Sequence, residues 1–253
     1  MLVGHSLGAI LAYDLISYFW AAQREARTVR AGTREFDALR EVEATAARLA
    51  TGPSPAARAA YAGAQRTLRR ALAARSGTSS FARRWLISDL VTMGNPLTHA
   101  EFLLARSAAD LEGRVEAREL PVSPPYREAL DPGVREAAKA AGLLPPDAPE
   151  SARLMTFPDG IGSGRWTMHH AAPFAAVRWT NLYDPARFVF LGDLIGGPVG
   201  DVFGPAIDET NLSTLDGRSR RLTHSRYWAA DQSPVRIEAL RQAINLLDVP
   251  PPG

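Results

Sequence analysis

The stretch MLVGHSLGAILAYDL, residues 1–15, decides how the rest of the chain is interpreted. Apolar residues 1–3 lead directly into the pattern Gly-x-Ser-x-Gly at Gly4, Ser6 and Gly8, and helix-forming residues follow. This order predicts a strand, a sharp turn and a helix. The pattern alone would arise by accident about one time in ten in a chain of this length at average composition. Its position between an expected strand and an expected helix makes it more specific.

Ser6 is the candidate nucleophile, because a tight turn between a strand and a helix lifts the serine oxygen clear of the sheet. We expect side chains at Gly4 and Gly8 to clash with the neighbouring strand and helix. The helix N-terminus favours negative charge, and the main-chain N–H of Leu7 is a candidate oxyanion donor. His5 should point away from Ser6 and pack rather than act as a base. A glycine-rich turn without chemistry is the alternative.

Composition is that of an ordinary globular protein, with 253 residues of which 46% are hydrophobic and 22% charged. No apolar run approaches the ~18 residues that span a bilayer. A net charge of +2 is too small to favour nucleic acid as a partner. The chain has no cysteine, which excludes disulfides, thiolate catalysis and Cys-ligated zinc. No signal-peptide pattern precedes the motif, so a cytoplasmic location is the expectation.

Residues 21–84 are rich in Ala and Arg and predict a helical insertion. Thr33 is the expected N-cap of a first helix that closes at Gly52, and Ser54 is the expected N-cap of a second helix that ends near Gly77. The basic face of this pair is expected to be solvated. A face that binds a membrane or a partner is the weaker alternative.

The remainder of the chain predicts further strands, a cap and a terminal helix. Strands are expected at residues 87–93, 174–183 and 208–213. The Pro-rich residues 105–172 are expected to form an irregular cap or lid, apart from a short helix from Asp131 to Gly142. The final helix is expected to start at Ser233-Pro234, with Ile237, Leu240, Ile244 and Leu247 on one face. Alternating strands and helices predict an α/β fold with a mostly parallel sheet.

Val3-Gly4-His5-Ser6-Leu7-Gly8 resembles the nucleophile elbow of bacterial lipases and esterases of the α/β-hydrolase superfamily. Residues 92–97 (TMGNPL) resemble the strand after the elbow in lipase-like members, which often read Gly-Ser-Pro where this chain has Asn95. Residues 177–183 resemble the strand before the triad acid, and residues 223–228 the loop that carries the triad histidine. The resemblance implies a partial α/β-hydrolase fold over residues 1–253, interrupted by the helical insertion, with no metal or cofactor.

The resemblance also implies the chain order serine, acid, histidine. Of the five histidines, His224 lies after the third expected strand and just before the final helix, and it is the expected base. The acid stays open between Asp193, in a Gly-rich stretch, and Asp184, directly after the strand. Asp193 is preferred, and Asp201 is a distant third. His169-His170 is a poor metal site because no acid or cysteine lies at ligand spacing.

Three residues precede the Gly-x-Ser-x-Gly pattern, whereas the resemblance implies several strands there and a loop that gives the second oxyanion N–H. We therefore expect the chain to correspond to the C-terminal half of such a fold, with the other half supplied by upstream sequence or by another chain. Residues 1–3 would leave an apolar sheet edge exposed. The chain alone is expected to be poorly stable or to self-associate through that edge.

The sequence thus predicts a serine hydrolase that acts on esters of small molecules or lipids. Ser6 would attack the acyl carbonyl, His224 would accept its proton, and Asp193 would orient the imidazole. An acyltransferase that uses the same three residues is one alternative. A binding module that keeps the fold without activity is another, because fold alone does not decide function.

Overall fold

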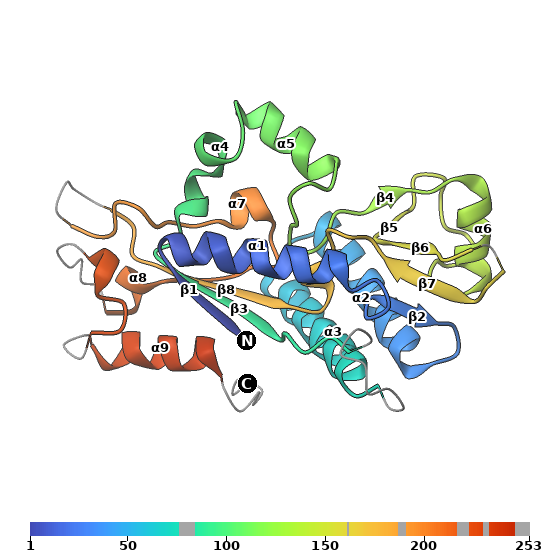
Figure 1. Ribbon diagram of the computed structural model, residues 1–253, viewed down its shortest axis with the longest axis horizontal. Coiled ribbons are helices and arrows are strands. Elements are labelled where there is room, and N and C mark those ends of the chain that lie inside the picture. The colour runs from blue at the N-terminus through green and yellow to red at the C-terminus, as the bar shows by residue number, and fades with distance from the viewer. Residues whose placement is uncertain (76–83, 161, 187–190, 217–222, 230–232, 246–253) are drawn as a thin grey trace. The chain divides into compact units, whose positions relative to one another are not determined.

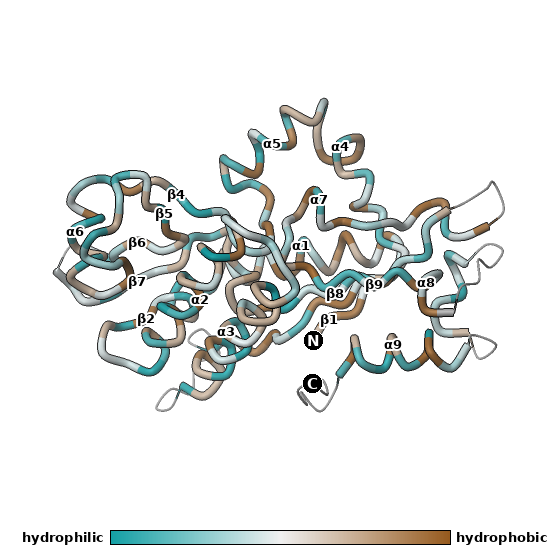
Figure 2. Tube along the Cα trace, turned by 180° about the vertical axis from the view of Figure 1, so that it is seen from behind, coloured by the Kyte–Doolittle hydropathy of each residue, from teal (hydrophilic) through white to brown (hydrophobic). Residues whose placement is uncertain are grey.

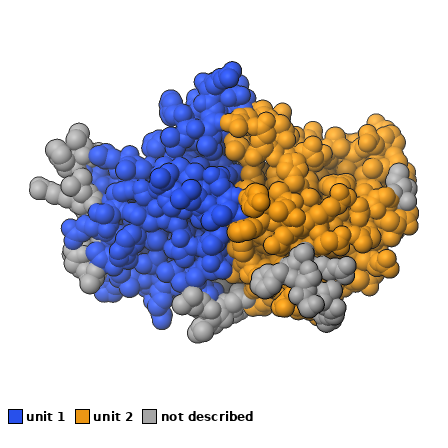
Figure 3. All heavy atoms as spheres, in the orientation of Figure 1, with its two compact units in different colours: residues 1–15, 89–111, 179–253 blue, residues 16–88, 112–178 orange. Residues whose placement is uncertain are grey.

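The structure is a computed structural model of the chain (Figure 1). It describes residues 1–75, 84–160, 162–186, 191–216, 223–229 and 233–245. The chain forms two compact units, which Figure 3 colours separately. The first consists of residues 1–15, 89–111 and 179–253, and the second of residues 16–88 and 112–178. The segment 21–84 and most of the segment 105–172 therefore belong to the second unit.

The first unit is built on a four-stranded parallel sheet in the order β1-β3-β8-β9. Its strands are β1 (Leu2–His5), β3 (Asp89–Met93), β8 (Arg178–Tyr183) and β9 (Asp208–Asn211). The expected strands at 87–93 and 208–213 are confirmed as β3 and β9, each shorter than predicted. Leu90 and Val91 of β3 are both fully buried. A continuous apolar run of this kind is typical of a parallel strand that is covered on both faces.

Helices cover both faces of this sheet. On α1 (Leu7–Ala22), buried Tyr13 packs against Trp179 of β8, with ring centroids 5.5 Å apart. On α9 (Pro234–Ile244), Ala243 lies in one apolar cluster with Leu182 of the same strand. Because side chains alternate along a strand, Trp179 and Leu182 point to opposite faces, and so α1 and α9 cover opposite faces (Figure 1). Further helical segments of the first unit are η2 (Pro96–His99), α4 (Ala100–Leu103), α7 (Gly200–Phe203), α8 (Leu212–Asp216) and η4 (Thr223–Ser225), and α5 (Ala108–Glu116) runs from the first unit into the second.

The final helix starts at Pro234 as predicted, but its buried face is not the expected one. The buried side chains are Arg236 and Ala243, whereas Ile237 is exposed. Of the other expected residues, Leu240 and Ile244 are partly buried and Leu247 lies outside the described residues. The helix turns Arg236 inward because this side chain pairs with a buried carboxylate, Asp184.

The second unit contains the predicted pair of helices, α2 (Arg34–Thr51) and α3 (Pro55–Ala73). The side chains of Thr33 and Ser54 each accept a hydrogen bond from the main-chain N–H three residues further on, at 3.3 and 3.1 Å, so both N-caps are confirmed. Gly52 caps the first helix, as expected. The second helix ends at Ala73, earlier than the expected end near Gly77, which lies outside the described residues. Both helices alternate between hydrophilic and hydrophobic residues (Figure 2).

The third expected strand, 174–183, begins later than predicted, at Arg178. Pro173–Ala175 instead form the 3₁₀ turn η3. The hydroxyl of Tyr61 on α3 donates to the main-chain oxygen of Phe174 at 2.6 Å. This carbonyl therefore has a side-chain partner in place of a neighbouring strand.

The second unit also contains short strands that the sequence did not indicate. The strands β2 (Thr28–Arg30), β6 (Thr156–Pro158) and β7 (Arg165–Met168) form an antiparallel sheet in the order β2-β7-β6, and β4 (Glu128–Ala129) pairs with β5 (Arg153–Leu154). The stretch 105–172 is therefore less irregular than expected. Strands this short give no readable period in the sequence. The short helix expected after Asp131 is confirmed as α6 (Pro132–Ala140).

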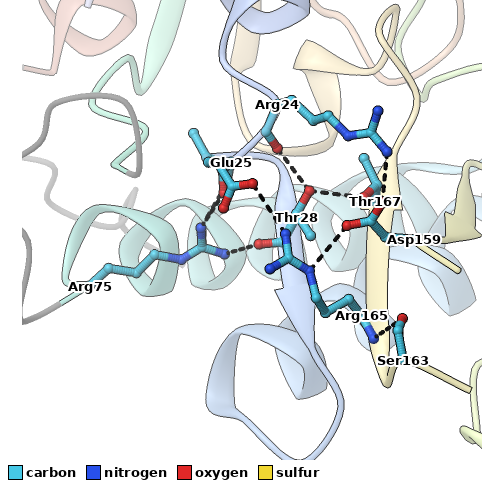
Figure 4. A network of polar contacts seen from close by, with 9 residues as sticks. Arg24, Glu25, Thr28, Arg75, Asp159, Ser163, Arg165 and Thr167 are labelled. Carbon is cyan, nitrogen blue, oxygen red and sulfur yellow. Dashed lines mark hydrogen bonds and ion pairs between the residues drawn. The ribbon is translucent and has the colours of Figure 1, made fainter.

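Polar side chains form a network around β2 and its neighbour β7 (Figure 4). The hydroxyls of Thr28 and Thr167 lie 2.8 Å apart. Asp159 binds Arg24 at 2.7 Å and Arg165 at 3.1 Å. The charged members are partly exposed, so their ion pairs contribute little to stability.

The β1 side of the first unit exposes apolar side chains. Among the described strands, β1 lies at the sheet edge, and its Val3 is exposed. Leu7, Leu11 and Leu15 are exposed along one face of α1. None of the helices in the described part of the chain is both long enough and apolar enough to cross a membrane.

Candidate active site

Ser6 occupies a strained turn between β1 and α1. Its φ is +54°, in the left-handed region that residues other than glycine rarely adopt. The main-chain N–H of Ser6 donates to the carbonyl of Met93 at 3.1 Å, and its own carbonyl accepts from Ala9 at 2.9 Å. The turn is thus fixed to the end of β3 on one side and to the first turn of α1 on the other.

The two glycines of the motif have different roles. A Cβ at Gly4 would lie 2.5 Å from the carbonyl oxygen of Gly8 and 2.6 Å from the Cα of Ala9, so the expected clash is confirmed there. In the described part of the chain, no heavy atom other than those of its chain neighbours and of its own helix backbone lies within 4 Å of the place that a Gly8 Cβ would take. The prediction is therefore wrong for Gly8. What matters at Gly8 is its main-chain oxygen, which lies where it would clash with a Cβ at Gly4.

His224 joins Ser6 to Asp193. The His224 Nε2 lies 2.9 Å from the Ser6 Oγ, and the Nδ1 lies 2.9 and 3.0 Å from the two carboxylate oxygens of Asp193. The three residues come from the β1–α1 turn, from the segment after β8, and from η4. In the neutral imidazole this geometry places the proton on Nδ1, where it is donated to Asp193, and leaves Nε2 to accept the Ser6 O–H.

The Asp193 carboxylate is buried and fully hydrogen-bonded. Oδ1 accepts the main-chain N–H groups of Ile195 at 2.8 Å and Gly196 at 3.0 Å, and Oδ2 accepts the Tyr227 hydroxyl at 2.8 Å. Burial raises the pKa of Asp193, but the bonds from Gly196 and Ile195, followed by those from His224 and Tyr227, outweigh it and hold the pKa below its usual value. Asp193 is therefore charged when it faces the imidazole.

Two glycines make room for the pair of Asp193 and His224. Gly94, at the end of β3, has a φ of +55°, and a Cβ there would lie 2.8 Å from the Asp193 Oδ2 and 3.0 Å from the His224 Nδ1. A Cβ at Gly196 would lie 2.3 Å from the Cα of Gly94. Sequence reasoning singled out the TMGNPL segment but missed this role. The glycine at a strand end was the available signal.

Asp184, the alternative acid, has a different partner. Its Oδ2 lies 2.8 Å from the Arg236 Nη1, and both side chains are buried. Its main-chain carbonyl accepts the N–H of Asp193 at 2.7 Å. Asp184 thus supports the segment that carries Asp193, while Asp193 itself meets the histidine. Asp201, the third candidate, lies in α7.

His5 packs against the loop of His224, as expected for a residue that is not the base. Its Nε2–H donates to the main-chain carbonyl of His224. The two imidazole rings have centroids 4.8 Å apart, and the indole of Trp228 meets the His5 ring edge-on at 4.8 Å. Leu7 begins α1, so its main-chain N–H is among those that have no acceptor within the helix. Its oxyanion role stays a prediction.

The neighbouring histidines His169 and His170 lie in the second unit and form hydrogen bonds with main-chain carbonyls there. The His169 Nε2 donates to the Tyr126 carbonyl at 2.8 Å, and its Nδ1 accepts the Ala171 N–H at 3.1 Å. Burial lowers the pKa of His169 to about 4, so its ring is neutral at pH 7. Within the described residues, no three His, Cys, Asp or Glu side chains are grouped so that they could hold a metal ion.

No protein-family model, curated protein or solved structure matches this chain. The mixed α/β fold with its parallel sheet is what the structure itself shows. The chemistry of the site accordingly follows from its geometry. A serine hydroxyl bonded to an imidazole, whose other nitrogen faces a buried carboxylate, can lose its proton as it attacks an electrophilic carbon.

Proposed function

We propose that this chain belongs to a serine hydrolase of the α/β-hydrolase class, which cleaves carboxylic esters through an acyl-enzyme. The observation that carries the proposal is the position of His224, which lies 2.9 Å from both the Ser6 Oγ and the Asp193 Oδ1. The positive φ of Ser6, between a strand and a helix of a parallel sheet, supports the class.

The reaction begins when the Ser6 Oγ attacks the ester carbonyl and His224 Nε2 takes the hydroxyl proton. Asp193 keeps the imidazole oriented and stabilises the imidazolium that forms. The main-chain N–H of Leu7 donates to the carbonyl oxygen as it becomes negative. His224 then gives the proton to the departing alcohol, and the acyl group remains on Ser6. A water molecule, deprotonated by His224, releases the acid and restores the serine.

The surroundings of the site favour an ester with an apolar acyl group. Leu7 follows the nucleophile and is 63% exposed, and Leu194 follows Asp193 and is 56% exposed. Trp228, which contacts His5, is 51% exposed. Large exposed apolar side chains beside a reactive group are typical of a surface that binds apolar ligands. Small-molecule and lipid esters are the proposed substrate class.

Hydrolysis of a series of p-nitrophenyl esters of increasing acyl length tests the proposal. We expect turnover that Ser6→Ala lowers by about 10⁴-fold or more. Ser225→Ala, which changes an exposed serine beside His224, is the matched control and should keep the wild-type rate. Added alcohols that become acylated would instead favour acyl transfer. Equal turnover by wild type and Ser6→Ala would contradict the proposed nucleophile.

A further inference from the structure

We infer that Tyr227 is a positioning residue that sets the orientation and the basicity of His224 by way of Asp193. The Tyr227 hydroxyl donates to the Asp193 Oδ2 at 2.8 Å, and the same oxygen lies 3.0 Å from the His224 Nδ1. Tyr227, Asp193, His224 and Ser6 thus form one continuous chain of hydrogen bonds. The inference rests on the proposed function, because it concerns the base of that reaction.

The hydroxyl of Tyr227 completes the hydrogen bonding of the carboxylate. The main-chain N–H groups of Ile195 and Gly196 both bind Oδ1. On the other oxygen, Oδ2, the hydroxyl of Tyr227 shares the site with the imidazole of His224. Without this hydroxyl, Oδ2 would keep only its contact with the imidazole at 3.0 Å, whereas Oδ1 would keep both main-chain N–H groups. Tyr227 therefore resists the rotation that would carry Oδ2 away from the imidazole.

Packing fixes the ring that carries this hydroxyl. Tyr227 is 4% exposed and belongs to the apolar cluster that also contains Met93 and Leu182. Its Cε2 lies 3.1 Å from the point that a Cβ of Gly94 would occupy. The ring is thus confined by the sheet, and the hydroxyl has little freedom to leave the carboxylate. The packing of the Tyr227 ring in the core therefore helps to hold Asp193, and through it His224, in one orientation.

The hydroxyl also affects how strongly Asp193 attracts a proton on His224. Burial, and then the charge of Asp193, raises the pKa of Tyr227, so the hydroxyl remains a donor over the working range of pH. The Tyr227 hydroxyl stabilises the negative charge of Asp193 by donating to Oδ2. Because part of that charge is then balanced by the hydroxyl, Asp193 stabilises the imidazolium form of His224 less. Among the residues that the structure describes, other titratable groups close to these side chains include His5, against the His224 ring, and Asp184, which adds to the rise in the pKa of Tyr227 and pairs with Arg236.

The test is Tyr227→Phe, which removes the hydroxyl and keeps the ring. We expect kcat for a short p-nitrophenyl ester to fall about tenfold at neutral pH with KM little changed. The acidic limb of the plot of kcat/KM against pH should move to higher pH, because His224 becomes the stronger base. Tyr18→Phe, which removes an exposed hydroxyl, is the control and should change neither quantity.

An NMR titration of the His224 ring protons measures the same effect without turnover. Tyr227→Phe should raise the pKa of His224, and Tyr227→3-fluorotyrosine, which keeps the ring and strengthens the donor, should lower it. An unchanged His224 titration in both variants would overturn the inference, as would a loss of kcat that matches a loss of folded protein without any shift in pH. Shifted titrations in a folded protein that hydrolyses no ester would leave Tyr227 as the residue that tunes His224 and would reject only the proposed function.

Discussion

Asp184 and Arg236 form a buried ion pair in which the carboxylate and guanidinium groups lie 2.8 Å apart. The pair connects the end of β8 to α9 through the Asp184 Oδ2. The main-chain carbonyl of Asp184 also accepts the Asp193 N–H, so Asp184 helps to hold the segment that carries Asp193. The two candidate acids are therefore neighbours with separate tasks, one structural and one directed at His224.

This separation predicts different results for two matched substitutions. Asp193→Asn should lower the rate of ester turnover by about 10⁴-fold, because the amide holds the imidazole in the wrong tautomer. Asp184→Asn should lower the free energy of unfolding, because it removes the charge that compensates buried Arg236. Its turnover per folded molecule should stay close to that of the wild type. The assignment would be reversed if Asp184→Asn abolished turnover in folded protein and Asp193→Asn did not.

Gly94→Ala should damage both the fold and the site. The new methyl group would lie about as close to the Asp193 carboxylate as a hydrogen-bonding atom, on a backbone with a φ of +55°. We expect the free energy of unfolding to fall by about 1–3 kcal/mol, as measured by urea denaturation. Gly63→Ala is the matched control, because that glycine lies in α3 with open space around it and should gain up to about 1 kcal/mol. Equal stability of the two variants would contradict the close packing at Gly94.

Glu43 predicts a dependence of stability on pH. Burial raises the pKa of Glu43 from 4.5 to about 7, against the opposing charge of Arg127 at 3.6 Å and hydrogen bonds from Thr156 and Met155. The folded protein then keeps a proton that the unfolded chain releases at lower pH. At pH values below about 4.5, the pKa of Glu43 in the unfolded chain, this group contributes about 3 kcal/mol to the free energy of unfolding. The contribution is lost as the pH rises to about 7, the pKa of Glu43 in the folded protein.

Glu43→Gln should remove this loss. Relative to the variant, the wild type should become less stable as the pH rises from about 4.5 to about 7, and the difference should be constant above that range. Urea unfolding at several pH values measures the difference. Glu41→Gln, at an exposed position on the same helix, should run parallel to the wild type. If Glu43→Gln also ran parallel, Glu43 would not hold its proton in the folded protein.

Self-association through the sheet edge remains a prediction, and the structure shows where to test it. Val3 at the edge and Leu11 on α1 are exposed apolar side chains. Changing Val3→Lys and Leu11→Lys together should shift the chain toward monomer in analytical ultracentrifugation, because charge at an edge opposes strand pairing. Leu215→Lys, at another exposed leucine, should leave the distribution unchanged. A wild-type chain that is already a cooperatively melting monomer would contradict the prediction.

Features that depend on neighbours in the chain could be predicted from the sequence, and features that depend on distant residues could not. The N-caps Thr33 and Ser54 bond to residues three positions away, so the local pattern suffices. Thr28 and Thr167 meet across 139 positions of sequence, and no local pattern indicates that β2 pairs with β7.

The site shows the same division. The motif at Ser6 is local. The resemblance indicated His224 as the base, but it left the acid open between Asp193, which was preferred, and Asp184. Tyr227 was missed because its bond to Asp193 requires the ring to be placed by the core. Arg236 was missed because an arginine in an amphipathic helix is ordinarily solvated, and only the buried Asp184 draws it inward.

The most direct test of the proposed chemistry is labelling by a fluorophosphonate probe, with the modified peptide identified by mass spectrometry. The probe should modify Ser6 in the 253-residue chain expressed alone or in a longer product of its gene. His224→Ala should abolish the modification while the protein stays folded. Labelling at Ser6 that depends on His224 would establish a working nucleophile and base. A folded wild type that is not labelled, or is labelled equally in His224→Ala, would contradict the proposal and favour a non-catalytic binding module.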